Sequence, residues 1–152
     1  MICDRQDLVD SICKIDLSEL EASSTIEPRY RVLLAKAIRS IWLEKQGADE
    51  LILEAMEETD PDLPSVNAPD WALHIDVPLI KLIHDVYSKD VDFKKNFEWA
   101  SELNEKFWST GSRTDDWDGF ISVELTGVLQ WARMQDMTIK PLAVSRILVE
   151  SN

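Results

Sequence analysis

Chemistry in this sequence would have to come from its aspartates, its two histidines or its two cysteines. The stretch DDWDG, at 115–119, has enough carboxylates to suggest a calcium loop. When Gly119 is placed at the sixth position of an EF-hand loop, Thr114 falls at the first position and Leu125 at the twelfth. That loop needs an acidic ligand at the first position and a bidentate glutamate at the twelfth. We therefore predict no dedicated metal site.

The histidines and cysteines are not spaced as metal ligands or catalytic groups. His74 and His84 have Pro78 between them and cannot form an i, i+4 pair on one helix. Cys3 and Cys13 lack the CxxC spacing of metal and redox sites. The sequence contains no GxSxG, P-loop or GxGxxG motif. We therefore predict no catalytic residue and no cofactor, and we expect that the chain is not an enzyme.

Two polar segments place aspartates beside a tryptophan. Segment 59–70 leads into Trp71, and segment 110–119 contains Trp117. An aromatic side chain surrounded by charge is a common arrangement at interface hot spots. The alternative is that each indole folds back on the core at a helix start. Under the first interpretation, the predicted partner-binding residues are Asp60, Asp62, Asp70, Trp71, Asp115, Asp116, Trp117 and Asp118.

The net charge of the chain limits the classes of molecule that we expect it to bind. Its 152 residues include 16 Lys and Arg against 29 Asp and Glu, a formal net charge of -13. Such a charge disfavours binding to nucleic-acid phosphates and to anionic membrane surfaces. It favours a fast encounter with a basic protein surface. The alternative is that the acidic residues only keep the protein soluble. We therefore expect a basic-surfaced protein partner, no direct nucleic-acid binding and no membrane binding, and the oligomeric state stays open.

The clearest element that could position such loops is a helix over 28–46. Pro28 suits its first position, and Gly47 suits the left-handed residue just after its end. The segment has five basic residues and one acidic residue, a net charge of +4. The face opposite its apolar side carries Arg29, Lys36 and Arg39. This basic face either pairs with acidic neighbours or forms a strip that binds an anion.

Apolar residues at helical spacing predict further helices. The predicted ranges are 4–15, 48–58, 78–88, 92–109 and 117–134, with a short last helix after Thr138. The segment FISVEL, at 120–125, would also pass as a strand. We predict one all-α domain over 1–152, an irregular bundle of six or seven helices around a central hairpin at 28–58.

These features favour a small acidic protein-binding module. We expect an inhibitor, of the antitoxin, immunity or phage-encoded kind, that occludes a positively charged surface such as a nucleic-acid-binding site. One alternative is a structural or adaptor subunit held by apolar helix faces, and another is an enzyme without a recognisable motif. The first ten residues form no signal-peptide-like run, and no segment is apolar enough to span a bilayer, so we expect a cytoplasmic protein.

Overall fold

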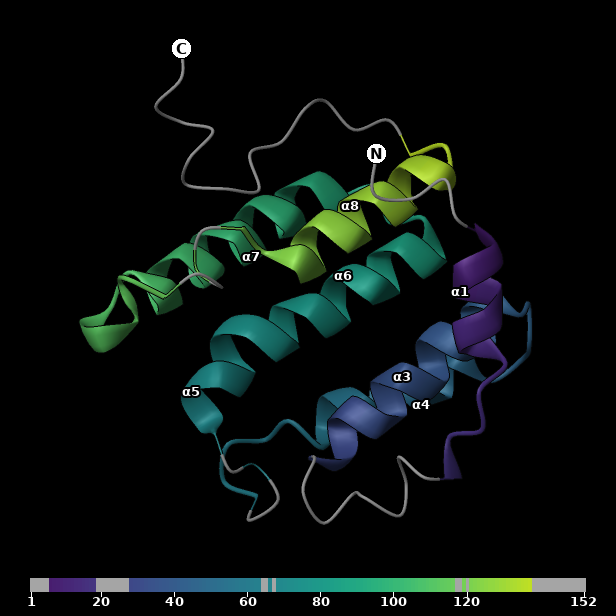
Figure 1. Ribbon diagram of the computed structural model, residues 1–152, viewed down its shortest axis with the longest axis horizontal. Coiled ribbons are helices and arrows are strands. Elements are labelled where there is room, and N and C mark those ends of the chain that lie inside the picture. The colour runs from purple at the N-terminus through teal and green to yellow at the C-terminus, as the bar shows by residue number, and fades with distance from the viewer. Residues whose placement is uncertain are drawn as a thin grey trace. The chain divides into compact units, whose positions relative to one another are not determined.

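The computed structural model describes residues 6–18, 28–63, 66, 68–116, 119 and 121–137. Regular structure within these residues is helical, apart from a single bridge residue at Ile121 (Figure 1). The prediction of an all-α fold is therefore confirmed. The chain divides into two compact units, Met1–Asn67 (unit 1) and Ala68–Asn152 (unit 2). That the chain forms one domain stays a prediction.

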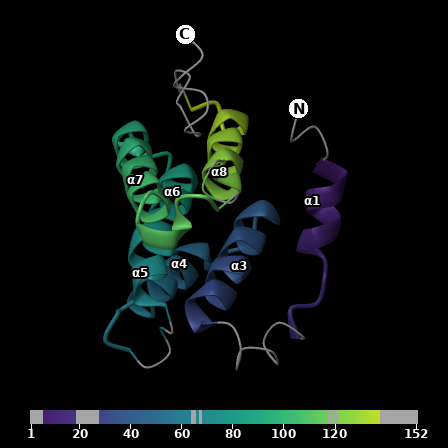
Figure 2. The same ribbon diagram turned by 60° about the vertical axis from the view of Figure 1, so that its left-hand side comes forward.

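Unit 1 is built on the helical hairpin that the sequence predicts. Helix α3, Arg29–Trp42, packs against helix α4, Ala48–Glu57 (Figures 1 and 2). Helix α1, Gln6–Cys13, contacts α3, and the Trp42 indole Nε1 donates a hydrogen bond of 2.7 Å to Asp10 Oδ1. The residues of α3 and α4 without any exposed surface are Ala37, Ala48 and Ala55. Small side chains on the buried faces therefore let these helices pack closely.

Helix α3 ends at Trp42, earlier than the predicted boundary at 46. Glu44 takes the left-handed conformation, with φ of 52°, and the backbone N–H of Lys45 donates to the Ser40 carbonyl at 2.8 Å. This is a Schellman motif in which a glutamate occupies the position usually given to glycine. Gly47, with φ of 87°, instead precedes α4 as its N-cap residue. The prediction misplaced the end because it took Gly47, and not Glu44, as the left-handed residue that ends α3.

Helix α1 ends at Cys13, before the predicted end at residue 15, and its apolar side faces solvent. Leu8, Ile12 and Ile15 are 50%, 64% and 58% exposed, whereas the neighbouring Cys13 is buried. The helical spacing of these three residues therefore marks an exposed apolar strip and not a core face.

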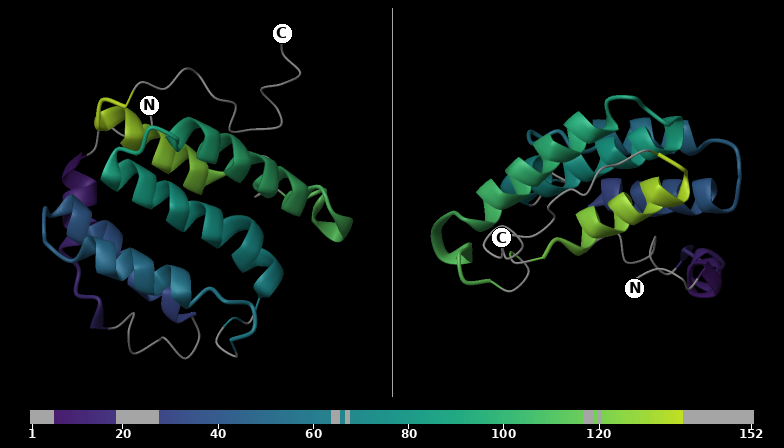
Figure 3. Two further views of the ribbon diagram at one scale, coloured as in Figure 1. Left: turned by 180° about the vertical axis from the view of Figure 1, so that it is seen from behind. Right: turned by 90° about the horizontal axis from the view of Figure 1, so that it is seen from above.

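Unit 2 is organised around helix α6, Val77–Ser88. It packs against α7, Phe93–Trp108, and against α8, Val123–Met134 (Figures 1 and 3). The predicted inward stripe of α7 is confirmed at the buried residues Phe93, Phe97, Ala100 and Phe107. Trp99, also on α7, is 41% exposed.

Pro78 does not begin a helix, which corrects the predicted range 78–88. Helical structure starts at Pro69, in α5 (Pro69–Trp71), and continues through a π-helical segment, Ala72–Asp76, directly into α6. In a regular α-helix the proline ring would clash with the carbonyl four residues earlier. The wider π turn immediately before Pro78 accommodates the ring, with the Val77 N–H donating to the Ala72 carbonyl.

Helix α8 starts later than the predicted residue 117. Ser122 is its N-cap, and the Ser122 hydroxyl accepts a hydrogen bond of 3.3 Å from the Leu125 N–H. The ambiguous segment 120–125 thus changes from a bridge residue to a helix within a few residues. The short helix predicted after Thr138 lies outside the described residues.

Candidate functional site

The first acidic loop belongs to unit 1 and follows the end of α4. Asp60 and Asp62 are both exposed. The Asp60 carboxylate accepts a hydrogen bond of 3.0 Å from the Asp62 N–H, and the Asp60 carbonyl accepts one of 3.0 Å from the Leu63 N–H. Asp60 therefore shapes the turn, and both carboxylates remain at the surface.

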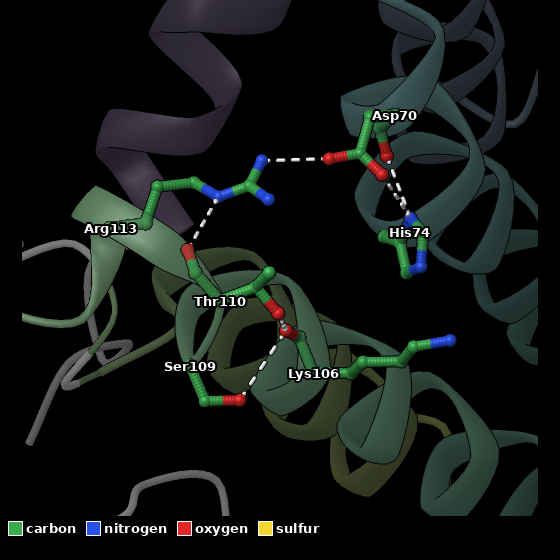
Figure 4. A network of polar contacts seen from close by, with 6 residues as sticks. All are labelled: Asp70, His74, Lys106, Ser109, Thr110 and Arg113. Carbon is green, nitrogen blue, oxygen red and sulfur yellow. Dashed lines mark hydrogen bonds and ion pairs between the residues drawn. The ribbon is translucent and has the colours of Figure 1, made fainter.

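Asp70 lies in the short helix α5 of unit 2, where an arginine from a distant part of the chain reaches it. Arg113 Nη1 donates to Asp70 Oδ2 at 2.8 Å (Figure 4). His74 Nδ1 is 3.1 Å from Asp70 Oδ1. The hydrogen bond from Arg113 holds the pKa of the Asp70 carboxyl below its usual range. Asp70 is therefore an ionised but already paired carboxylate.

Trp71 packs on the aromatic cluster of unit 2, formed by Phe107 and Trp108 at the end of α7 together with Ile75. Its indole meets the Phe107 ring edge-on at 5.3 Å and the Trp108 ring at 5.8 Å, both with an interplanar angle of 86°. Arg113 completes the arrangement, with its guanidinium carbon 3.8 Å from the centre of the Phe107 ring. This geometry is the one expected of an indole folded back on the core, and a role as interface anchor stays a prediction.

The second acidic loop follows a 3-10 helix, Gly111–Arg113. Asp115 and Asp116 are exposed, and the Asp116 N–H donates to the Arg113 carbonyl at 3.1 Å. Trp117 and Asp118 lie outside the described residues. Arg113 therefore brings Asp70 and the Asp115–Asp116 pair into one neighbourhood, whereas Asp60 and Asp62 belong to the other unit.

Arg113 is the residue of this neighbourhood that sequence reasoning missed. Arg113 is the only basic residue in the segment 110–119, two positions before the first of its aspartates. That isolated positive charge is the one signal that could have indicated an ion pair. The partner, Asp70, is 43 residues away, so the pairing itself had no local signature.

We expect Arg113→Gln to raise the pKa of the Asp70 carboxyl towards that of an unperturbed aspartate, because the hydrogen bond that lowers it is lost. Because the folded-state pKa lies below the unfolded value, the pair stabilises the protein above the unfolded pKa. That stabilisation is lost as the pH falls through the folded pKa. A carboxyl ¹³C NMR titration of wild type and variant measures the change.

Lys106→Gln is the matched control for this titration. Lys106 acts on Asp70 only through its charge, without the hydrogen bond that Arg113 provides. We expect a much smaller rise in the Asp70 pKa. Equal rises in the two variants would show that net charge, and not the hydrogen bond, sets the titration.

The described residues contain no group of three or more His, Cys, Asp or Glu side chains placed to hold a metal ion. None of the described helices is both long enough and apolar enough to cross a membrane. The neighbourhood around Arg113 places the exposed carboxylates Asp115 and Asp116 near a packed aromatic cluster.

Comparison with known proteins supplies the biological role. Searches of the curated proteins and of the solved structures returned no match. The model of the family described as Immunity protein 49 (Imm49) matches residues 1–141. Immunity proteins are non-enzymatic inhibitors that bind a cognate toxin, so the expectations of an inhibitor and of a chain that is not an enzyme are confirmed. With nearly its whole length matched, the chain belongs to the Immunity protein 49 family.

Proposed function

We propose that the chain inhibits its cognate toxin by covering a positively charged surface of it with the acidic loops. The observation that carries the proposal is the exposed pair Asp115 and Asp116, held beside Asp70 by Arg113. The formal net charge of -13 gives these loops a long-range attraction for a basic partner.

The mechanism is occlusion. Carboxylates at the loop tips take the places that phosphates would occupy on a basic nucleic-acid-binding or nuclease surface, and they steer the two proteins together. Asp60 and Asp62 of unit 1 add exposed carboxylates of the same kind. Trp71 and Trp117 would supply apolar contact area at the interface. The inhibitor acts in the cytoplasm, where it meets the toxin.

Asp70 has a different part from Asp115 and Asp116 in this proposal. Its carboxylate is hydrogen-bonded to Arg113, so part of its charge is already neutralised within unit 2. Its main contribution is to hold the loop that carries the other two aspartates. The test of the interface therefore rests on Asp115 and Asp116.

The double variant Asp115→Asn with Asp116→Asn tests the proposal. We expect the association rate with the toxin to fall about tenfold at low salt and to become less salt-dependent, with the dissociation rate little changed. Surface plasmon resonance at two ionic strengths measures both rates. The toxin can be identified by affinity capture at low and high salt, together with the products of neighbouring genes.

A matched control removes the same charge elsewhere in unit 2. Glu102 and Glu105 are exposed on α7, and the variant Glu102→Gln with Glu105→Gln removes the same two negative charges. We expect a clearly smaller fall in association rate. If the two double variants associate equally fast, the loop does not steer the toxin and the proposed interface is wrong.

A second candidate function, a subunit or adaptor held by apolar helix faces, is favoured by the exposed strip of Leu8, Ile12 and Ile15. Sedimentation at two salt concentrations separates the candidates. Self-association that does not weaken with salt favours the strip. A monomer that binds the toxin in a salt-sensitive way favours the acidic loops.

A further inference from the structure

Unit 1 contains an open pocket of about 380 Å³ whose charge is opposite to that of the chain. The residues that line it include Lys36, Arg39, Ser40 and Lys45, with Asp16 as the acidic member. Three basic side chains thus face one carboxylate in a protein with a formal net charge of -13. The pocket is within the size range of small-molecule sites.

The fold of the hairpin creates this concentration of charge. Arg39 and Ser40 lie in the last turn of α3. The Schellman motif then reverses the chain, so that the Lys45 N–H bonds the Ser40 carbonyl at 2.8 Å and the Lys45 side chain joins the same pocket. Had α3 continued to residue 46, Lys45 would have lain further along a straight helix.

The basic residues of α3 have different surroundings at the two ends of the helix. At its start, Arg29 pairs with Glu54 and, at 3.3 Å, with Glu58, as expected of ordinary neutralisation by an acidic neighbour. At its end, the Arg39 Nε–H is shielded from solvent and has no hydrogen-bond acceptor among the described residues. A buried donor without an acceptor costs free energy, which an acceptor brought within reach by a rotation of the guanidinium would recover.

We propose that this pocket of unit 1 is an oxyanion-binding site, in which Arg39, Lys45 and Lys36 hold a phosphate or carboxylate group. Arginine presents a planar fork of donors to such a group, and lysine adds mobile point charges. The Ser40 hydroxyl supplies a further donor at the pocket wall. The proposal is independent of the acidic loops, because no residue of those loops lines the pocket.

Titration of the full-length, ¹⁵N-labelled chain with inorganic phosphate, at constant ionic strength set with chloride, tests the site. We expect saturable shifts of the Arg39 Nε–H and of the Ser40 and Lys45 amide signals in ¹H–¹⁵N spectra. Lys45→Gln should weaken phosphate binding about tenfold, as expected for one lost charge-assisted hydrogen bond. Lys45 is exposed, so this variant should fold normally.

Two further variants complete the test. Arg39→Lys keeps the positive charge but removes the fork, and it should also weaken phosphate binding. Lys14→Gln removes an exposed positive charge of unit 1 outside the pocket and should leave binding unchanged. The absence of saturable shifts with phosphate, or equal weakening by Lys45→Gln and Lys14→Gln, would overturn the proposal.

A second arm of the experiment identifies the source of the oxyanion. If saturating phosphate and Lys45→Gln each weaken toxin binding, the group is a carboxylate or phosphate carried by the toxin complex. If neither affects toxin binding while phosphate still binds, the pocket takes a free phosphorylated small molecule. Both outcomes support the site, and neither depends on the behaviour of the Asp115 and Asp116 variants.

Discussion

We expect Lys81→Ala to lower the free energy of unfolding by about 3 kcal/mol, because it leaves a buried carboxylate without its counter-ion. Asp85 has no exposed side-chain surface, and Lys81, one helical turn earlier on α6, forms an ion pair with its Oδ1. The figure is taken at the low end of the range for broken buried pairs, since Lys81 is itself 36% exposed.

The second oxygen of Asp85 links α6 to α7. Asn96 Nδ2 donates to Asp85 Oδ2 at 2.7 Å, and we expect this bond to remain in the Lys81 variant. It stabilises the carboxylate but cannot neutralise it. We therefore expect the loss to be partial and the α6–α7 packing to be retained in native buffer.

Lys94→Ala is the matched control for Lys81→Ala. Lys94 also pairs with a carboxylate one turn away, Glu98, at 3.6 Å, but both side chains are more than half exposed. An exposed pair of this kind is worth less than about 1 kcal/mol. Urea denaturation followed by circular dichroism measures both variants. If they lose the same stability, solvent reaches Asp85 and the pair is not a buried one.

The sequence predicted the elements better than their ends. The hairpin of α3 and α4 and the stripe of α7 follow from the 3.6-residue period of apolar residues, because burial of one face dominates the stability of a helix. The end of α3 could not be placed in this way. Glu44, Lys89 and Asp136 all take the left-handed conformation, and such positions are usually given to glycine.

Long-range polar contacts account for most of what the sequence could not show. In the sequence, nothing distinguishes Asp85 and its neighbour His84 from the other polar residues of the chain. Asp85 is nevertheless fully buried and paired. The contact between Arg113 and Asp70 joins residues far apart in the chain. Neither periodicity nor local spacing reports such pairings, because they depend on which helices pack together.

The candidate site was predictable in its residue types but not in its construction. Of the eight residues predicted for the interface, the exposed Asp60, Asp62, Asp115 and Asp116 have the surface position that such a role needs. The sequence did not decide whether Trp71 is an interface anchor or an indole that packs on the core. Its packing against Phe107 makes it the residue whose substitution best separates stability from binding.

We expect Trp71→Ala to lower the free energy of unfolding by about 3 kcal/mol, the low end of the range for Trp→Ala, because the indole is half-buried. The substitution removes two edge-to-face contacts, to Phe107 and Trp108, and opens a cavity beneath α5. Trp71→Phe keeps an aromatic ring in the cluster and should lose clearly less stability. Thermal unfolding followed by circular dichroism measures both.

Trp99→Ala serves as the matched control, since Trp99 is 41% exposed and lies on α7, the helix that also carries Phe107. We expect a smaller loss of stability than for Trp71→Ala. Toxin dissociation is then measured at a temperature where every variant is folded. If Trp71 also anchors the toxin, Trp71→Ala dissociates faster than Trp99→Ala, because the loss of an anchor acts mainly on the dissociation rate. A Trp71→Ala variant as stable as wild type would show that the indole is not part of the aromatic cluster.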